Sequence, residues 1–158
     1  MKEKHIALDS LEDDFAGFAS SGRRRARETA LIMLYQMDFG GNDLSAAEHT
    51  LSSLGLNEDN AAFARQLVDK TQAAKTLCDQ LIAEHSREWD FERLFNIDVT
   101  ILRLALCELN SNIPYNIVIN EAVELAKKFG DAASPAFVNA VLDAVNQRTE
   151  DSRQRTDN

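Results

Sequence analysis

Four arginines lie within five positions of the sequence, at Arg23, Arg24, Arg25 and Arg27. Guanidinium groups bind phosphates and carboxylates well, because their N–H donors match paired oxygen acceptors. The cluster is unexpected in a chain with a formal net charge of −9. It also opens a helical pattern, and the helix dipole disfavours each cation at that end by roughly 0.3–1 kcal/mol. We therefore interpret it as a binding site for an anionic partner, either a nucleic acid or an acidic protein, rather than as a solvated face.

The helical repeat predicts how these side chains are arranged. Successive residues step by about 100° around the axis, which places Arg23, Arg24 and Arg27 on one side and turns Arg25 away. We expect three exposed guanidinium groups beside the apolar stripe of the same helix. Such an arc would contact three or four phosphates, and for single strands this implies a log–log salt slope of about −2 to −3.

Other patterns that could do chemistry are weak. The histidines His5, His49 and His85 are scattered without ligand spacing, so we expect neither a metal nor a cofactor. Cys78 and Cys107 lie far apart and within helical patterns, which is typical of small core residues in a reducing compartment. The chain has no glycine-rich phosphate loop and no G-x-S-x-G element, so we do not expect an enzyme.

The elements that would position the arginines are all helical. Apolar residues recur at steps of three and four, no segment alternates with period two, and only six glycines and two prolines interrupt the chain. The pattern predicts an all-α fold of six or seven helices, with a connector over residues 86–98. The expected helices cover residues 24–39, 44–54, 58–85, 99–111 and 135–147, and a further one runs from the "NIPYN" stretch to Gly130.

The ends of the chain differ from its centre. Residues 1–22 form an acidic N-terminal extension, in which a short amphipathic helix over residues 6–18 and disorder are equal alternatives. Residues 23–148 form the helical domain, and residues 149–158 are a polar tail that we expect to fray. No apolar run is long enough to cross a bilayer, and acids occupy the place of a signal peptide, so we expect a cytoplasmic protein.

Three stretches together resemble the NusB family of transcription antitermination factors. They are "RRRARETALIMLYQMD", "ILRLALCEL" and "IPYNIVINEAVELAKKFGDAASPAFVNAVLDAV". The resemblance implies two three-helix bundles packed across one another. It also implies binding to boxA, a short single-stranded RNA element in nascent rRNA transcripts, together with NusE, a small-subunit ribosomal protein. That complex joins RNA polymerase and other Nus factors, and its NusB component occurs as a monomer or homodimer.

The resemblance assigns roles residue by residue. Arg23, Arg24, Arg25 and Arg27 match the segment that contacts RNA in the family. Phe137 opens the F-V-N motif and is either near the RNA or a core aromatic.

A second set of positions matches the NusE side. Tyr35 in "LYQ" matches a position associated with the NusE interface and is otherwise a half-buried core residue. Glu92 and Asp98 suit a basic partner surface, although Asp98 also has a predicted role in capping the helix over residues 99–111.

The chain departs from the family where positive charge is common. Asn116, Pro135 and Ala136 carry none, and Ala140 replaces a usual glycine. RNA affinity should therefore depend more heavily on the arginine cluster and on the partner. We also hypothesise that the acidic extension folds over the arginines as an RNA mimic. Two alternatives are a helical protein-interaction module without RNA binding and a non-catalytic relative of the N-terminal domain of rRNA cytosine methyltransferases.

Overall fold

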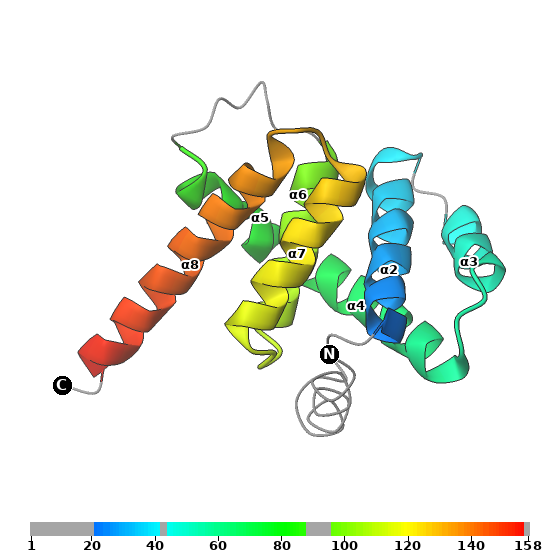
Figure 1. Cartoon of the computed structure of the whole chain (residues 1–158), viewed down its shortest axis with the longest axis horizontal. Helices are drawn as coiled ribbons and strands as arrows, with labels where there is room; N and C mark the ends of the chain where they lie inside the picture. The colour runs from blue at the N-terminus through cyan, green and yellow to red at the C-terminus, as the bar shows by residue number, and fades with distance from the viewer. Residues whose placement is uncertain (1–20, 42–43, 88–95, 157–158) are drawn as a thin grey trace, which may run out of the picture. The chain divides into compact units, whose positions relative to one another are not determined.

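A computed structural model of the chain describes residues 21–41, 44–87 and 96–156. The described residues form seven α-helices, α2 to α8, and contain no strand (Figure 1). The all-α prediction is therefore confirmed. The contacts divide the chain into two compact units, Met1–Val68 and Asp69–Asn158, called the N-terminal and C-terminal units below. None of the described helices is long and apolar enough to span a bilayer.

The N-terminal unit contains α2 (Ser21–Phe39), α3 (Leu44–Ser53) and most of α4 (Glu58–Ala73). Helices α2 and α3 lie side by side (Figure 1). The predicted apolar stripe of α2 is buried, with Ala26, Ala30 and Leu34 inside the unit. Asn57 caps α4, because its Oδ1 accepts the Asn60 backbone N–H at 2.8 Å. This cap fixes where α4 begins.

The C-terminal unit contains the end of α4 and four further helices. These are α5 (Lys75–His85), α6 (Asn96–Leu109), α7 (Tyr115–Phe129) and α8 (Ser134–Thr156). Helix α6 packs against α5, α7 and α8, and it is buried nearly all round, as its apolar sequence predicted. Gly130 ends α7 as expected, and its N–H donates to the carbonyl of Ala126.

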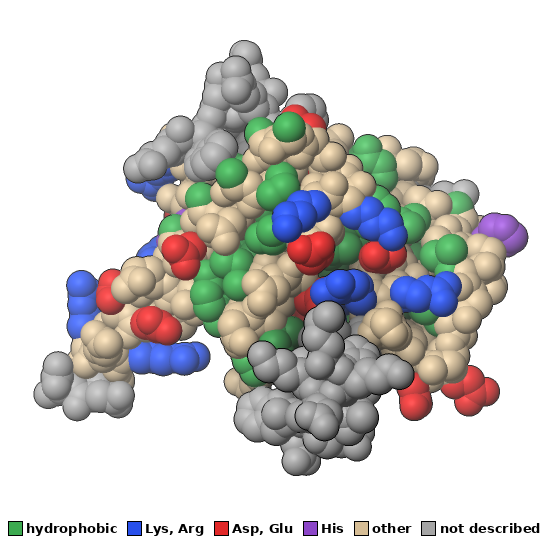
Figure 2. Space-filling view, viewed as in Figure 1, with side chains coloured by type: hydrophobic (Ala, Val, Ile, Leu, Met, Phe, Trp, Pro, Cys, Tyr) green, Lys and Arg blue, Asp and Glu red, His purple; other side chains and the backbone are tan. Residues whose placement is uncertain are grey.

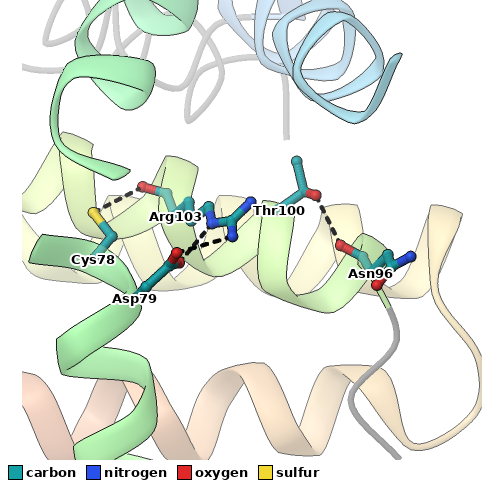
Figure 3. Close-up of polar contacts among 5 residues, drawn as sticks. All are labelled: Cys78, Asp79, Asn96, Thr100 and Arg103. Atoms are coloured by element: carbon teal, nitrogen blue, oxygen red, sulfur yellow. Dashed lines mark hydrogen bonds and ion pairs between the residues drawn. The ribbon is translucent and has the colours of Figure 1, made fainter. Parts of the chain in front are cut away.

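A buried arginine of the apolar helix α6 is paired with a carboxylate on the neighbouring helix α5. Arg103 of α6 donates from Nε to Oδ1 of Asp79 at 2.7 Å and from Nη2 to Oδ2 at 3.1 Å (Figure 3). The backbone carbonyl oxygen of Arg103 accepts a hydrogen bond from the buried thiol of Cys78. Paired hydrogen bonds of this kind offset the loss of solvent around a buried guanidinium. The pair joins α5 to α6.

The helix boundaries differ most from the sequence prediction at four places. The expected helix over residues 58–85 is two helices, because the backbone at Ala74 turns to φ −93° and ψ 5°. Helix α2 begins at Ser21 and α6 begins at Asn96, three residues earlier than expected in both cases. Helix α8 continues to Thr156, where fraying was expected, because no glycine or proline follows residue 135 to stop it.

Two predictions lie outside the described residues. The expected connector falls mostly within residues 88–95, and the acidic extension falls mostly within residues 1–20. The hypothesis that the extension covers the arginines therefore stays a hypothesis.

Candidate nucleic-acid interface

The arginine cluster occupies the first two turns of α2. Arg24 and Arg25 are exposed, and Arg23 is partly exposed. No acidic residue lies in the first turn of this helix, so nothing there offsets the helix dipole. The cluster therefore presents concentrated positive charge at the start of a rigid element, which suits contact with an anion.

Two of these side chains are tied to neighbouring parts of the N-terminal unit. Arg23 donates from Nη1 to the carbonyl of Asp59 at 3.1 Å and to Oδ1 of Asn60 at 3.0 Å. Arg25 donates from Nη2 to the carbonyl of Leu54 at 2.9 Å. These hydrogen bonds restrict long side chains that would otherwise sample many rotamers. The cluster is thus partly ordered before any ligand binds.

The expectation that Arg27 is exposed was wrong. Its side chain lies inside the protein, with only 1% of the residue exposed. One of its neighbours is Phe63 of α4, whose ring centroid lies 5.4 Å from Arg27 Cζ, within the range of a cation–π contact. Position along α2 alone could not reveal this neighbour, which comes from a different helix. Arg27 therefore has almost no surface to offer to RNA.

The surface around the cluster carries both positive and negative side chains. Right of centre in Figure 2, blue Lys and Arg side chains lie next to red acidic ones. Helix α3 contributes Glu48, which pairs with Arg65 of α4 at 2.9 Å. A surface of mixed sign does not attract long polyanions strongly, whereas a few ordered arginines can still grip a short segment.

Phe137 lies at the start of α8 and is 4% exposed. Val138 and Val141 of the same helix are buried as well. Of the two interpretations of Phe137, the burial favours the core aromatic. A contact between Phe137 and RNA stays a prediction, and the exposed neighbour Ala136 carries no charge that would assist it.

An aromatic pair is exposed near the end of α2. Tyr35 and Phe39 are 38% and 39% exposed, and their ring centroids lie 5.5 Å apart. Large exposed aromatic rings are typical of protein interfaces, where they bury much area with little loss of rotamer entropy. Tyr35 was expected either at an interface or half-buried in the core, and its exposure favours the interface. Phe39 was not predicted as an interface residue, although its position four residues after Tyr35 is the helical spacing for a pair.

Asp98 lies in the first turn of α6, not at the N-cap. It is 2% exposed, and no donor among the described residues reaches its Oδ1. Burial raises the pKa of this carboxyl, the hydroxyl of Ser134 acts in the opposite direction, and the charge of Asp131 raises it further. A buried acceptor without a donor is uncommon and costs stability. Glu92, the other residue predicted for a basic partner, lies outside the described residues.

The two cysteines are buried, as expected, and unpaired. Burial raises the pKa of Cys78 to about 11 and raises that of Cys107 as well. Among the described residues no group of His, Cys, Asp and Glu could hold a metal ion.

Comparison with known proteins adds a family. Residues 24–147 match the model of the NusB family. The transcription antitermination protein NusB of Desulforudis audaxviator is 41% identical over 134 residues, covering 83% of this chain and 97% of that protein. The NusB protein of Myxococcus xanthus is 41% identical over 130 residues, covering 78% of this chain and 93% of that protein.

Solved structures agree with these relatives. A crystal structure of T. maritima NusB superposes with a TM-score of 0.70 at 32% identity, covering 79% of this chain and 90% of that chain. A crystal structure of antitermination factors NusB and NusE in complex with dsRNA superposes with a TM-score of 0.70 at 30% identity, covering 80% of this chain and 97% of that chain.

Proposed function

The chain belongs to the NusB family of transcription antitermination proteins, and we propose that it binds boxA RNA together with NusE. In this role it joins RNA polymerase and the other Nus factors in the cytoplasm and supports processive transcription of rRNA. The observation that carries the proposal is the ordered arginine cluster at the start of α2, on a chain with a net charge of −9. As a member of this family the chain is a non-catalytic factor.

The proposed RNA contacts are Arg23, Arg24 and Arg25. All three retain exposed surface, and two are held by hydrogen bonds to their own unit, so their guanidinium groups can meet phosphates with little reordering. Three contacts to a single strand imply a log–log salt slope of about −2. Because Arg27 is buried, we assign it a structural role within the cluster and no contact with RNA.

The proposed contact with NusE in the N-terminal unit is the exposed pair of Tyr35 and Phe39. In the C-terminal unit, Asp98 is 2% exposed, and no donor among the described residues reaches its Oδ1. A basic side chain of NusE would supply the missing hydrogen bond only if binding exposed this carboxylate, which in the free protein offers as little surface as Arg27. Tyr35→Ala should weaken NusE binding, whereas Leu77→Ala, at an exposed apolar residue of the C-terminal unit, should not.

The decisive experiment is a titration of a boxA-like single-stranded RNA, with and without NusE, at several salt concentrations. Arg24→Glu should weaken binding by about tenfold or more, the loss expected for a charge-assisted hydrogen bond. It should also make the salt slope shallower by roughly 0.7. Arg65→Glu is the matched control, because it makes the same charge change at another exposed arginine of this unit.

The outcomes separate RNA binding from the alternative of a protein-interaction module. Equal losses for Arg24→Glu and Arg65→Glu would mean that only net charge matters. Binding to NusE with no binding to RNA under any condition would favour the interaction module.

A further inference from the structure

One aromatic ring lies beside two of the four clustered arginines. Phe63 of α4 is partly exposed, and its ring centroid lies 4.3 Å from Cζ of Arg23 and 5.4 Å from Cζ of Arg27. A cation within about 6 Å of a ring centroid is attracted to the negative face of the ring. A leucine at this position could fill similar space but could not provide that attraction.

The Arg23 guanidinium makes hydrogen bonds at its edge in addition to the ring contact at its face. Nη1 donates to the Asp59 carbonyl and to Oδ1 of Asn60, both at the start of α4. Gly22 permits this arrangement, because a Cβ at that position would overlap the side-chain amide of Asn60. Phe63 and Asn60 thus define the plane and the direction of one guanidinium group within the cluster.

We propose that Phe63 is a positioning residue for RNA binding, which orders Arg23 before the RNA arrives. This inference rests on the proposed function, since it concerns the same arginine cluster. A long arginine side chain loses rotamer freedom when it grips a phosphate, and a side chain that is already ordered loses less. Phe63 carries no charge, so it changes the affinity without releasing counterions.

That difference gives the proposal a signature that a packing role lacks. Phe63→Leu should weaken RNA binding by roughly threefold to tenfold, the range expected for a cation–π contact. The salt slope should stay that of the unchanged protein, because the number of phosphate contacts is the same. Phe63→Tyr keeps the ring and should bind within about twofold of the unchanged protein. In an Arg23→Ala background, Phe63→Leu should have no further effect.

The test measures RNA affinity and salt slope for these four variants, with Arg24→Glu as the reference and circular dichroism as the check of folding. If the unchanged protein does not bind RNA, the proposed function fails, and this inference fails with it. If Arg24→Glu binds RNA as tightly as the unchanged protein, the arginine cluster is not the RNA site, and this inference fails while RNA binding itself stands. If Arg24→Glu weakens binding but Phe63→Leu does not, only the positioning role is overturned. An equal loss for Phe63→Leu and Phe63→Tyr, or a loss that persists in the Arg23→Ala background, would also overturn it.

Discussion

Asp98→Asn should stabilise the free protein while it weakens binding to a basic partner. The substitution keeps the shape of the side chain and removes a charge that is almost completely buried. Removing a buried charge whose Oδ1 has no donor among the described residues should gain roughly 1–3 kcal/mol, with the gain at the low end because the new amide also lacks a partner there. Losing a negative charge from the first turn of a helix costs roughly 0.3–1 kcal/mol. The free energy of unfolding should therefore rise by about 1 kcal/mol at pH 7, which corresponds to roughly 2–4 °C in Tm.

The effect of pH on this variant has a definite sign. The pKa of Asp98 is raised in the folded protein, so the folded state favours the protonated carboxyl relative to the unfolded state. The folded protein has the full benefit of a protonated Asp98 at pH values below the pKa of the unfolded state, near 3.9. This part of the free energy of unfolding is lost as the pH rises through the pKa of the folded state. The advantage of Asp98→Asn should therefore be largest at neutral pH and should shrink as the pH falls.

Urea unfolding at a series of pH values measures both effects. Points close to the isoelectric point, about 4.8, are avoided because the protein carries little net charge there. Asp151→Asn is the matched control, since it removes the same charge from an exposed position on α8. An Asp98→Asn protein less stable than the unchanged protein at pH 7, or an advantage that grows as the pH falls, would refute the reasoning. A separate titration with NusE tests the loss of partner binding.

Three further predictions concern the C-terminal unit. Asp79→Ala removes the carboxylate that pairs with the buried Arg103 and should lower the free energy of unfolding by about 2 kcal/mol, measured in urea; a loss below roughly 0.5 kcal/mol would contradict the importance of the pair. At pH 8 only about one in a thousand Cys78 thiols should be ionised, so a thiol reagent should modify Cys78 and Cys107 at the rate of unfolding, and rapid labelling of the folded protein would be inconsistent with their burial. Burial and donation to a carboxylate raise the pKa of Tyr115, so absorbance near the phenolate band should show a tyrosine that ionises well above about pH 10, and this phase should vanish in Tyr115→Phe.

Local patterns predicted the parts of the fold that depend on one helix at a time. The stripe of α2 through Ala26 and Ala30 follows from the helical repeat and is buried as expected. The nearly all-apolar sequence of α6 likewise predicted a central helix. The break at Ala74 could not be predicted, because no glycine or proline marks it and both flanking segments favour helix.

The candidate site was predictable in composition but not in contacts. The four arginines are visible as a cluster, yet Arg27 is buried beside Phe63, which lies 36 residues further along the chain. The isolation of Asp98 Oδ1 likewise depends on which side chains surround the start of α6, a property of the folded unit that periodicity does not encode. Both misses concern side chains whose environment is set by another helix.

The acidic character of the chain and the ordering of its arginines are physically connected. With a net charge of −9 and the three phosphate contacts proposed above, the protein should obtain little affinity from long-range attraction, so we expect unrelated RNA to compete weakly. Because the contacts are few, the RNA affinity depends strongly on the geometry of each one. Arg23 contacts the face of the Phe63 ring and the side-chain amide of Asn60, and Arg25 donates to a backbone carbonyl. Both side chains are therefore ordered before the RNA binds, which lowers the entropy cost of binding. Specific recognition then has to come from the arrangement of few contacts and from the second protein, which is why loosening one guanidinium group should be measurable even though no charge is lost.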